Sequence, residues 1–272
     1  MKAQAGLLQA TLALLIALAA TFPAAAQTGT SPEPKPSPGA ATQAPESAEP
    51  PPDVANEFRV TAFPTYPISD TLTGFGYLGW VYKPDGEYTS YYLGTGVFYR
   101  PIQPVQFSFG LIGVYTNKWE TSNTLELRPF VGVKFLGATG RKWRYYNWTR
   151  YELRLTETLD TDAWKAVHRV RNQTRLEIPL ASLDRAWTPK SFYLLTDVEP
   201  IYRSDTGQLD PLRLRVGLGY VASERLLVEF QYYAQYTHPE GAGLTYTDNI
   251  FRLNLKISTR RGVMSILDNG ID

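Results

Sequence analysis

The 272-residue chain has no cysteine, only two histidines and no excess of charge of either sign, with 27 Lys and Arg against 26 Asp and Glu. Without cysteine, disulfide frameworks and thiolate metal sites are excluded. The balanced charge gives no case for a protein that binds nucleic acid through a general basic surface. Beyond the N-terminal region, no stretch approaches the ~20 apolar residues that a membrane-spanning helix needs.

The N-terminus has the features of a secretory signal peptide. Lys2 precedes an apolar run from Leu7 to Ala20, and the small residues Ala24 to Ala26 follow, as they do at a cleavage site. The alternative is an uncleaved membrane anchor, for which the run is short. The sequence therefore predicts a cleaved signal peptide at residues 1–26 and export from the cytoplasm.

Residues 27–56 predict a disordered, proline-rich periplasmic linker. Eight prolines lie between Gln27 and Asp53, in a stretch without any aromatic or large aliphatic residue. Such a segment cannot bury a core. We expect it to act as a tether, with a binding motif for a periplasmic partner as the alternative.

Most of the remaining chain alternates apolar and polar residues at period two, which is typical of β-strands. The predicted strands are 72–83, 90–100, 105–116, 124–136, 144–157, 167–180, 191–203, 212–222, 225–237 and 249–258, with 58–66 as a further candidate. Each is near the 9–11 residues with which a tilted strand spans a bilayer. We expect an all-β, antiparallel transmembrane β-barrel of about ten strands, alternatively twelve, at residues 57–260, followed by a C-terminal tail at 261–272.

The two faces of these strands differ in chemistry. Leu214 and Val216 belong to an apolar face, whereas Arg213 and Arg215 belong to a charged one. Alternation alone does not say which face is inside, because a soluble barrel turns its apolar face inward and an outer-membrane barrel turns it outward. If the charged face is inside, the lumen-lining residues are Arg128, Arg150, Glu152, Arg154, Arg169, Arg171, Arg175, Glu177, Asp197, Glu199, Arg213, Arg215, Glu229 and Arg252.

Three features favour the membrane arrangement. Tyr and Trp crowd the strand ends, as in the aromatic girdles of outer-membrane barrels. Glycines of the charged face, such as Gly96 and Gly219, are expected to make room for arginines in a narrow lumen. Arginine and glutamate alternate along single strands, as in Arg150, Glu152 and Arg154, and such sets can pair across strands. The aromatic residues in question are Trp80, Tyr82, Tyr88, Tyr91, Tyr92, Tyr115, Trp119, Trp143, Tyr145, Tyr146, Trp187, Tyr202 and Tyr236.

The connection lengths predict an orientation. If the strand at 72–83 starts from the periplasm, the short turns PIQP and SE face the periplasm and the long loop HPEGAGLTYTD faces outside. Short inner turns and longer outer loops are typical of outer-membrane barrels. With ten strands, both ends of the barrel chain would lie in the periplasm.

The segments RYELRL (150–155), RNQTRLEIPL (171–180), LRLRVGLGYVASERLLVEFQYYAQY (212–236) and FRLNLKIS (251–258) resemble those of small outer-membrane β-barrel proteins of Gram-negative bacteria. Within that group, the chain looks most like a barrel family of unknown function, over residues 57 to 259. The resemblance implies an outer-membrane location and a barrel fold. It implies no activity.

No catalytic, cofactor or metal site is predicted. Outer-membrane lipid hydrolases have a His-x-Ser pair, but neither His168 nor His238 has serine two residues on. The stretch GFGYLG at 74–79 matches the dinucleotide fingerprint GxGxxG, yet it precedes a strand and not the helix that this fingerprint requires. Asp160 and Asp162 could bind calcium weakly, although a solvated loop explains them better.

We therefore expect a narrow pore or a structural membrane protein, not an enzyme. On the inward parity, thirteen basic side chains oppose six acidic ones, and a lumen with that surplus favours anions. The expected partners are outer-membrane lipid and the barrel-assembly machinery. The alternatives are an outer-membrane lipid-acting hydrolase and a soluble periplasmic β-barrel that binds an apolar ligand.

Overall fold

The computed structural model describes residues 54–86, 88–138, 143–182, 185–238 and 243–259. The predicted signal peptide, all but the last residues of the proline-rich linker, and the predicted C-terminal tail lie outside the described residues. Within these ranges, no helix is long and apolar enough to cross a membrane.

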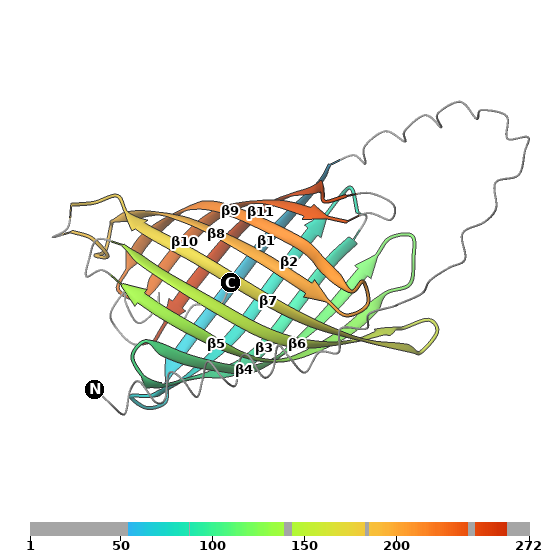
Figure 1. Cartoon of the computed structure of the whole chain (residues 1–272), viewed down its shortest axis with the longest axis horizontal. Helices are drawn as coiled ribbons and strands as arrows, with labels where there is room; N and C mark the ends of the chain where they lie inside the picture. Colours follow the sequence, from blue (N-terminus) through green and yellow to red (C-terminus); the bar gives the residue numbers. More distant parts are fainter. Residues whose placement is uncertain (1–53, 87, 139–142, 183–184, 239–242, 260–272) are drawn as a thin grey trace, which may run out of the picture. The chain divides into compact units, whose positions relative to one another are not determined.

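In the described residues, eleven β-strands form one closed barrel (Figure 1), which confirms the predicted all-β barrel fold. Their number falls between the two expected counts, ten and twelve. In chain order the strands are β1 (Ala55–Pro67), β2 (Leu72–Lys83), β3 (Tyr88–Ile102), β4 (Val105–Lys118), β5 (Thr124–Ala138), β6 (Arg144–Thr158), β7 (Ala163–Pro179), β8 (Phe192–Arg203), β9 (Gln208–Ser223), β10 (Leu226–Thr237) and β11 (Thr245–Ser258).

The strands pair in chain order and antiparallel, except at the closure. There β1 pairs with β11 in parallel, from Ala55 opposite Asp248 to Thr65 opposite Ser258, and the two strands lie side by side in Figure 1. The expected antiparallel arrangement therefore has this one exception. It follows from the odd count, because the first and last of eleven alternating strands run in the same direction.

This closure separates the two ends of the barrel chain. The A end carries Ala55 and the connections 84–87, 119–123, 159–162, 204–207 and 238–244. The B end carries the C-terminus of β11 and the connections 68–71, 103–104, 139–143, 180–191 and 224–225. The expectation that both ends of the barrel chain share one side is wrong for eleven strands. The longest connection, 180–191, also shares the B end with the shortest ones, so connection length does not distinguish the two sides.

The side chains of alternate residues point into the barrel. In β6, Arg150 is 4% exposed, whereas Tyr145 on the other parity is 45% exposed. In β9, Arg215 is buried and Val216 is exposed. The charged face is therefore inside and the apolar face is outside. Four aromatic residues assigned to an outer girdle from the sequence point inside instead. Tyr146 and Trp187 are buried there, because the parity of Tyr146 matches that of Arg150 and because the residues around Trp187 fold inward. Tyr88 and Tyr92 share the inward parity of Ser90, and they contact Glu57 and Arg128 inside the barrel.

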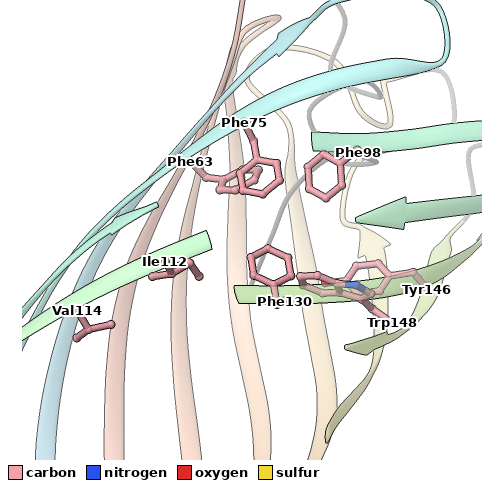
Figure 2. Close-up of a cluster of buried hydrophobic side chains, with 8 residues drawn as sticks. All are labelled: Phe63, Phe75, Phe98, Ile112, Val114, Phe130, Tyr146 and Trp148. Atoms are coloured by element: carbon pink, nitrogen blue, oxygen red, sulfur yellow. The ribbon is translucent and has the colours of Figure 1, made fainter. Parts of the chain in front are cut away.

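An aromatic cluster fills the interior of β1 to β6 toward the B end (Figure 2). The ring of Phe75 lies 5.3 Å from that of Phe63, 4.7 Å from that of Phe98 and 6.3 Å from that of Phe130, measured between centroids. Lys134 is 1% exposed, and its ammonium lies 4.5 Å above the ring of Tyr146. Buried rings at these distances attract one another and also a cation above their faces. The cluster comprises Phe63, Phe75, Phe98, Ile112, Val114, Phe130, Tyr146 and Trp148.

A second apolar cluster lies on the β7 to β10 side of the B end. Residues 185–191 fold back so that the ring of Trp187 lies 5.2 Å from that of Tyr193 and 5.7 Å from the guanidinium of Arg144. Leu195, Val221 and Leu227 complete the cluster with Ala186. Together the two clusters occupy the B-end half of the interior.

The inward glycines make room for these hydrophobic side chains and not for arginines, which corrects the sequence interpretation. A Cβ on Gly219 would lie 2.0 Å from the ring of Tyr193, and one on Gly96 would lie 2.3 Å from the ring of Phe75. A Cβ on Gly217 would lie 3.0 Å from Leu195. Close packing in a narrow barrel leaves these positions no space for a methyl group.

Candidate functional site

The fourteen residues predicted to line the lumen all belong to the inward set. Ten are buried: Arg150, Glu152, Arg169, Arg175, Glu177, Asp197, Glu199, Arg215, Glu229 and Arg252. Four are partly buried: Arg128, Arg154, Arg171 and Arg213. They come from β5 to β11, and cross-strand register brings several of them face to face, as for Glu152 opposite Arg169 and Asp197 opposite Arg215.

A fully buried ion network lies in the B-end half. Glu229 accepts hydrogen bonds from Arg175 at 2.5 Å and from the Tyr193 hydroxyl at 2.7 Å, and the ammonium of Lys256 lies 3.0 Å away. Arg175 also lies 3.0 Å from Glu177. Buried charges persist only when they are paired and hydrogen-bonded. Because this network is fully buried and packed between the two apolar clusters, we assign it a structural role and not ligand binding.

The A-end half holds a different arrangement, in which arginines outnumber the carboxylates that they contact. Glu152 forms ion pairs with Arg150 at 2.6 Å, with Arg171 at 3.3 Å and with Arg169. Arg171 also pairs with Glu199. One carboxylate shared by three guanidinium groups leaves positive charge in excess, because each carboxylate supplies a single negative charge.

The same sharing recurs on the neighbouring strands. Glu126 accepts hydrogen bonds from Arg154 at 2.5 Å and from Arg128 at 3.0 Å. Glu199 lies 3.6 Å from Arg213, whose guanidinium also donates to Gln235 at 2.7 Å.

A cavity of about 240 Å³ opens among these side chains. Ten basic and two acidic side chains line it, with four tyrosines among the other lining residues. The basic ones are Arg59, Lys83, Arg128, Arg150, Arg154, Arg169, Arg171, Arg213, Arg215 and Arg252, and the acidic ones are Glu57 and Glu152. Lys83 and Tyr88 flank the connection 84–87, so the cavity lies toward the A end.

Sequence reasoning missed part of this lining. Glu57 and Arg59 form an ion pair in β1, and Lys83 pairs with Asp248 at the end of β2. Because the sequence marks residues 58–66 only as a candidate strand, it predicts no inward face for them. The signal was present, since Glu57, Arg59 and Thr61 alternate with the apolar Phe58 and Val60.

The two histidines lie outside the cavity. His168 is exposed on the outward face of β7, where its Nδ1 lies 2.6 Å from the hydroxyl of Tyr151. His238 follows β10 and is half-buried, and its backbone N–H donates to Asp210 at 3.4 Å. In the part of the chain that the structure describes, no three His, Asp or Glu residues gather as metal ligands would. Asp160 and Asp162 are exposed in the connection between β6 and β7.

Searches of curated proteins and of solved structures found no match. A family model for proteins of unknown function matches residues 57–244, which cover β1 to β10 almost entirely and most of the cavity lining. The chain therefore belongs to the family described as "Protein of unknown function (DUF2490)".

Proposed function

We propose that the protein is an outer-membrane β-barrel whose interior is closed by its own side chains, so that it serves as a membrane-embedded structural or binding protein and not as an open pore. The observation that carries this proposal is the outward apolar surface. Every strand contributes at least one exposed large hydrophobic side chain, among them Leu78 at 50%, Leu93 at 69%, Val216 at 56% and Phe230 at 63%. Monomeric soluble proteins rarely expose apolar area on this scale, whereas lipid-facing barrel strands do.

Outward aromatic residues at both ends of the barrel support the proposal. Toward the A end, the ring of Trp80 stacks on Tyr82 at 5.9 Å, and Tyr82 lies 6.1 Å from Trp119. Toward the B end, the ring of Trp143 lies 5.7 Å from that of Tyr145, which is exposed. Tyr and Trp have amphipathic rings, and two belts of such rings, one near each end of the barrel, are typical of proteins that cross both membrane–water interfaces.

The apolar surface is interrupted on β6 and β7. There Asn147 and Asn172 bond each other through their side-chain amides at 3.0 and 3.1 Å. Asn147 also donates to Thr174 at 2.8 Å, and Asn172 donates to Thr149 at 2.8 Å. These mutual bonds lower the cost of exposing amides to hydrocarbon, since the amide groups are already hydrogen-bonded.

The choice of a closed barrel over a narrow pore rests on the filled B-end half. The aromatic cluster in Figure 2, the buried network around Glu229 and the inward connection at Trp187 lie across the interior. About eight strands give an interior just wide enough for side chains to fill, and the interior widens as strands are added. In this barrel of eleven strands, the aromatic rings and the residues around Trp187 occupy the extra width. A soluble barrel that binds an apolar ligand would instead need an apolar cavity, and the cavity here is lined by charges.

Two measurements test the proposal. The protein should fractionate with outer membranes and show a mobility shift on gels when heated, as folded transmembrane barrels do. In a planar bilayer it should give no steady conductance. A protein released in soluble form by osmotic shock contradicts the membrane location, and a stable single-channel current contradicts the closed interior while leaving the location intact.

A further inference from the structure

We infer that the cavity at the A end is a binding site for a small multivalent oxyanion that carries a phosphate group. This inference deepens the proposed function, because it assigns a ligand class to the part of the interior that side chains do not fill. It does not depend on which compartment the A end faces.

The first support is charge. Ten basic side chains and two acidic ones surround about 240 Å³. Three of the carboxylates that contact the basic groups are shared, Glu152 by three arginines and Glu126 and Glu199 by two each. Glu57, Asp197 and Asp248 each form an ion pair with one basic residue of the lining. Like charges gathered in a poorly solvated space repel one another strongly. An entering anion relieves that repulsion, so the cavity favours a ligand with more than one negative charge.

The second support is geometry. The basic groups approach from several directions, with Arg128, Arg154 and Arg171 on β5 to β7, Arg213 on β9, and Arg59 on β1, which lies across the closed barrel from β6. A planar carboxylate accepts hydrogen bonds in one plane, whereas the tetrahedral oxygens of a phosphate group accept from several directions. Guanidinium groups bind such oxygens through paired N–H donors.

The third support is access. The side chains of Arg59 and Lys83 are each 19% exposed to solvent, and that of Arg154 is 25% exposed. The side chains of Arg175 and Glu229, in the B-end half, are not exposed at all. Solvent therefore reaches the cavity from the A end. The aromatic cluster and the Glu229 network close the other side, so the cavity is a blind site and an anion enters and leaves by the same opening.

The test is calorimetric titration of the purified, folded full chain with inorganic phosphate and with glycerol phosphate, in chloride buffer of constant ionic strength. Saturable binding of inorganic phosphate indicates free phosphate as the ligand source, and binding of glycerol phosphate alone indicates a phosphate ester such as a lipid headgroup. Either probe should also raise the unfolding temperature, since a ligand that binds only the folded state stabilises it.

Arg213→Gln and Arg154→Gln are the test variants, because each leaves its carboxylate partner bonded to another arginine, Glu199 to Arg171 and Glu126 to Arg128. Loss of one charge-assisted contact should weaken phosphate binding about tenfold or more. Arg203→Gln is the matched control, since Arg203 lies at the A end of β8 and does not line the cavity; it should bind as the unaltered chain does.

Two results overturn the inference: the absence of saturable binding beyond the chloride background, or equal affinity in Arg213→Gln, Arg154→Gln and Arg203→Gln. Heat-modifiable mobility of each variant shows that it is folded. If the protein fractionates with membranes but binds neither probe, the oxyanion site is refuted and the membrane location is not. A soluble protein that binds phosphate refutes the membrane location alone.

Discussion

At the scale of single residues, the orientation of each side chain follows from strand parity. Leu214 and Arg215 are neighbours in sequence, yet the first is 44% exposed and the second 2% exposed. Successive side chains of a strand point to opposite faces, so one apolar and one cationic residue can each meet a suitable environment. Substituting an outward residue therefore tests directly whether the outward face of the barrel contacts lipid.

Leu214→Arg should impair folding into membranes more than Leu209→Arg does. Both leucines lie on β9 and are exposed, but Leu214 lies toward the middle of the strand and Leu209 near its A end. In a membrane, arginine costs ~2–4 kcal/mol at the midplane and ~0–1 kcal/mol near the interface. The folded fraction in lipid vesicles, read from heat-modifiable mobility, measures the difference. On a soluble barrel both substitutions would have small and similar effects.

Gly219→Ala should destabilise the barrel by ~1–3 kcal/mol, because overpacking a filled interior forces side chains from their preferred positions. The added methyl carbon would lie 2.0 Å from the Tyr193 ring, which is itself fixed by its bond to Glu229. Gly113→Ala is the control, since its nearest atom is 3.7 Å away. Urea unfolding in detergent compares the two. Equal stability of both variants would mean that Tyr193 has room to move.

At the scale of elements, the sequence predicted most strands well. Residues 72–83 coincide with β2, and 124–136 fall within β5 (Thr124–Ala138). The connection 180–191 could not be predicted to place Trp187 inside, because loop residues carry no periodicity. The parallel closure could not be predicted either, because no turn joins β1 to β11 and so no turn sequence fixes their pairing.

The candidate site was predicted in part, for a related reason. Parity marks Arg150, Glu152 and Arg169 as inward, and the structure brings them together in one ion network. The same parity also marks Phe75 and Phe98, but an aromatic residue has no preference between a filled interior and lipid. Only the three-dimensional register shows that their rings meet, so the division of the interior into a filled half and a cavity is a tertiary result.

The connection between β8 and β9 supplies a pH-dependent contact. Hydrogen bonds from Arg203 and from Lys165 lower the pKa of Asp205 from 3.8 to about 2. A lowered pKa in the folded state means that the contact is complete above about pH 4 and is lost as the pH falls toward 2. A carboxyl NMR titration of Asp205 should show that midpoint. Arg203→Gln should raise it, and an unchanged midpoint would remove Arg203 as the cause. Because Asp205 is exposed, its titration should change overall stability little.

At the scale of the whole molecule, eleven strands put Ala55 at the A end and Ser258 at the B end. For a barrel in a membrane, the two ends of its chain must then lie on opposite sides. The two orientation arguments from the sequence also conflict. A periplasmic linker before β1 requires the A end in the periplasm, whereas the start of the 72–83 strand in the periplasm requires the B end there.

The linker argument is the stronger one, because the B end carries both the shortest connections and the longest one, 180–191. We therefore expect the A end, with the cavity, to face the periplasm. The chain has no cysteine, so single cysteines report position cleanly. In intact cells, a membrane-impermeant maleimide should label Glu224→Cys at the B end and should label Thr206→Cys at the A end only after the outer membrane is permeabilised. The reverse pattern would place the anion cavity at the cell surface, and labelling of both sites in intact cells would contradict a membrane-spanning barrel.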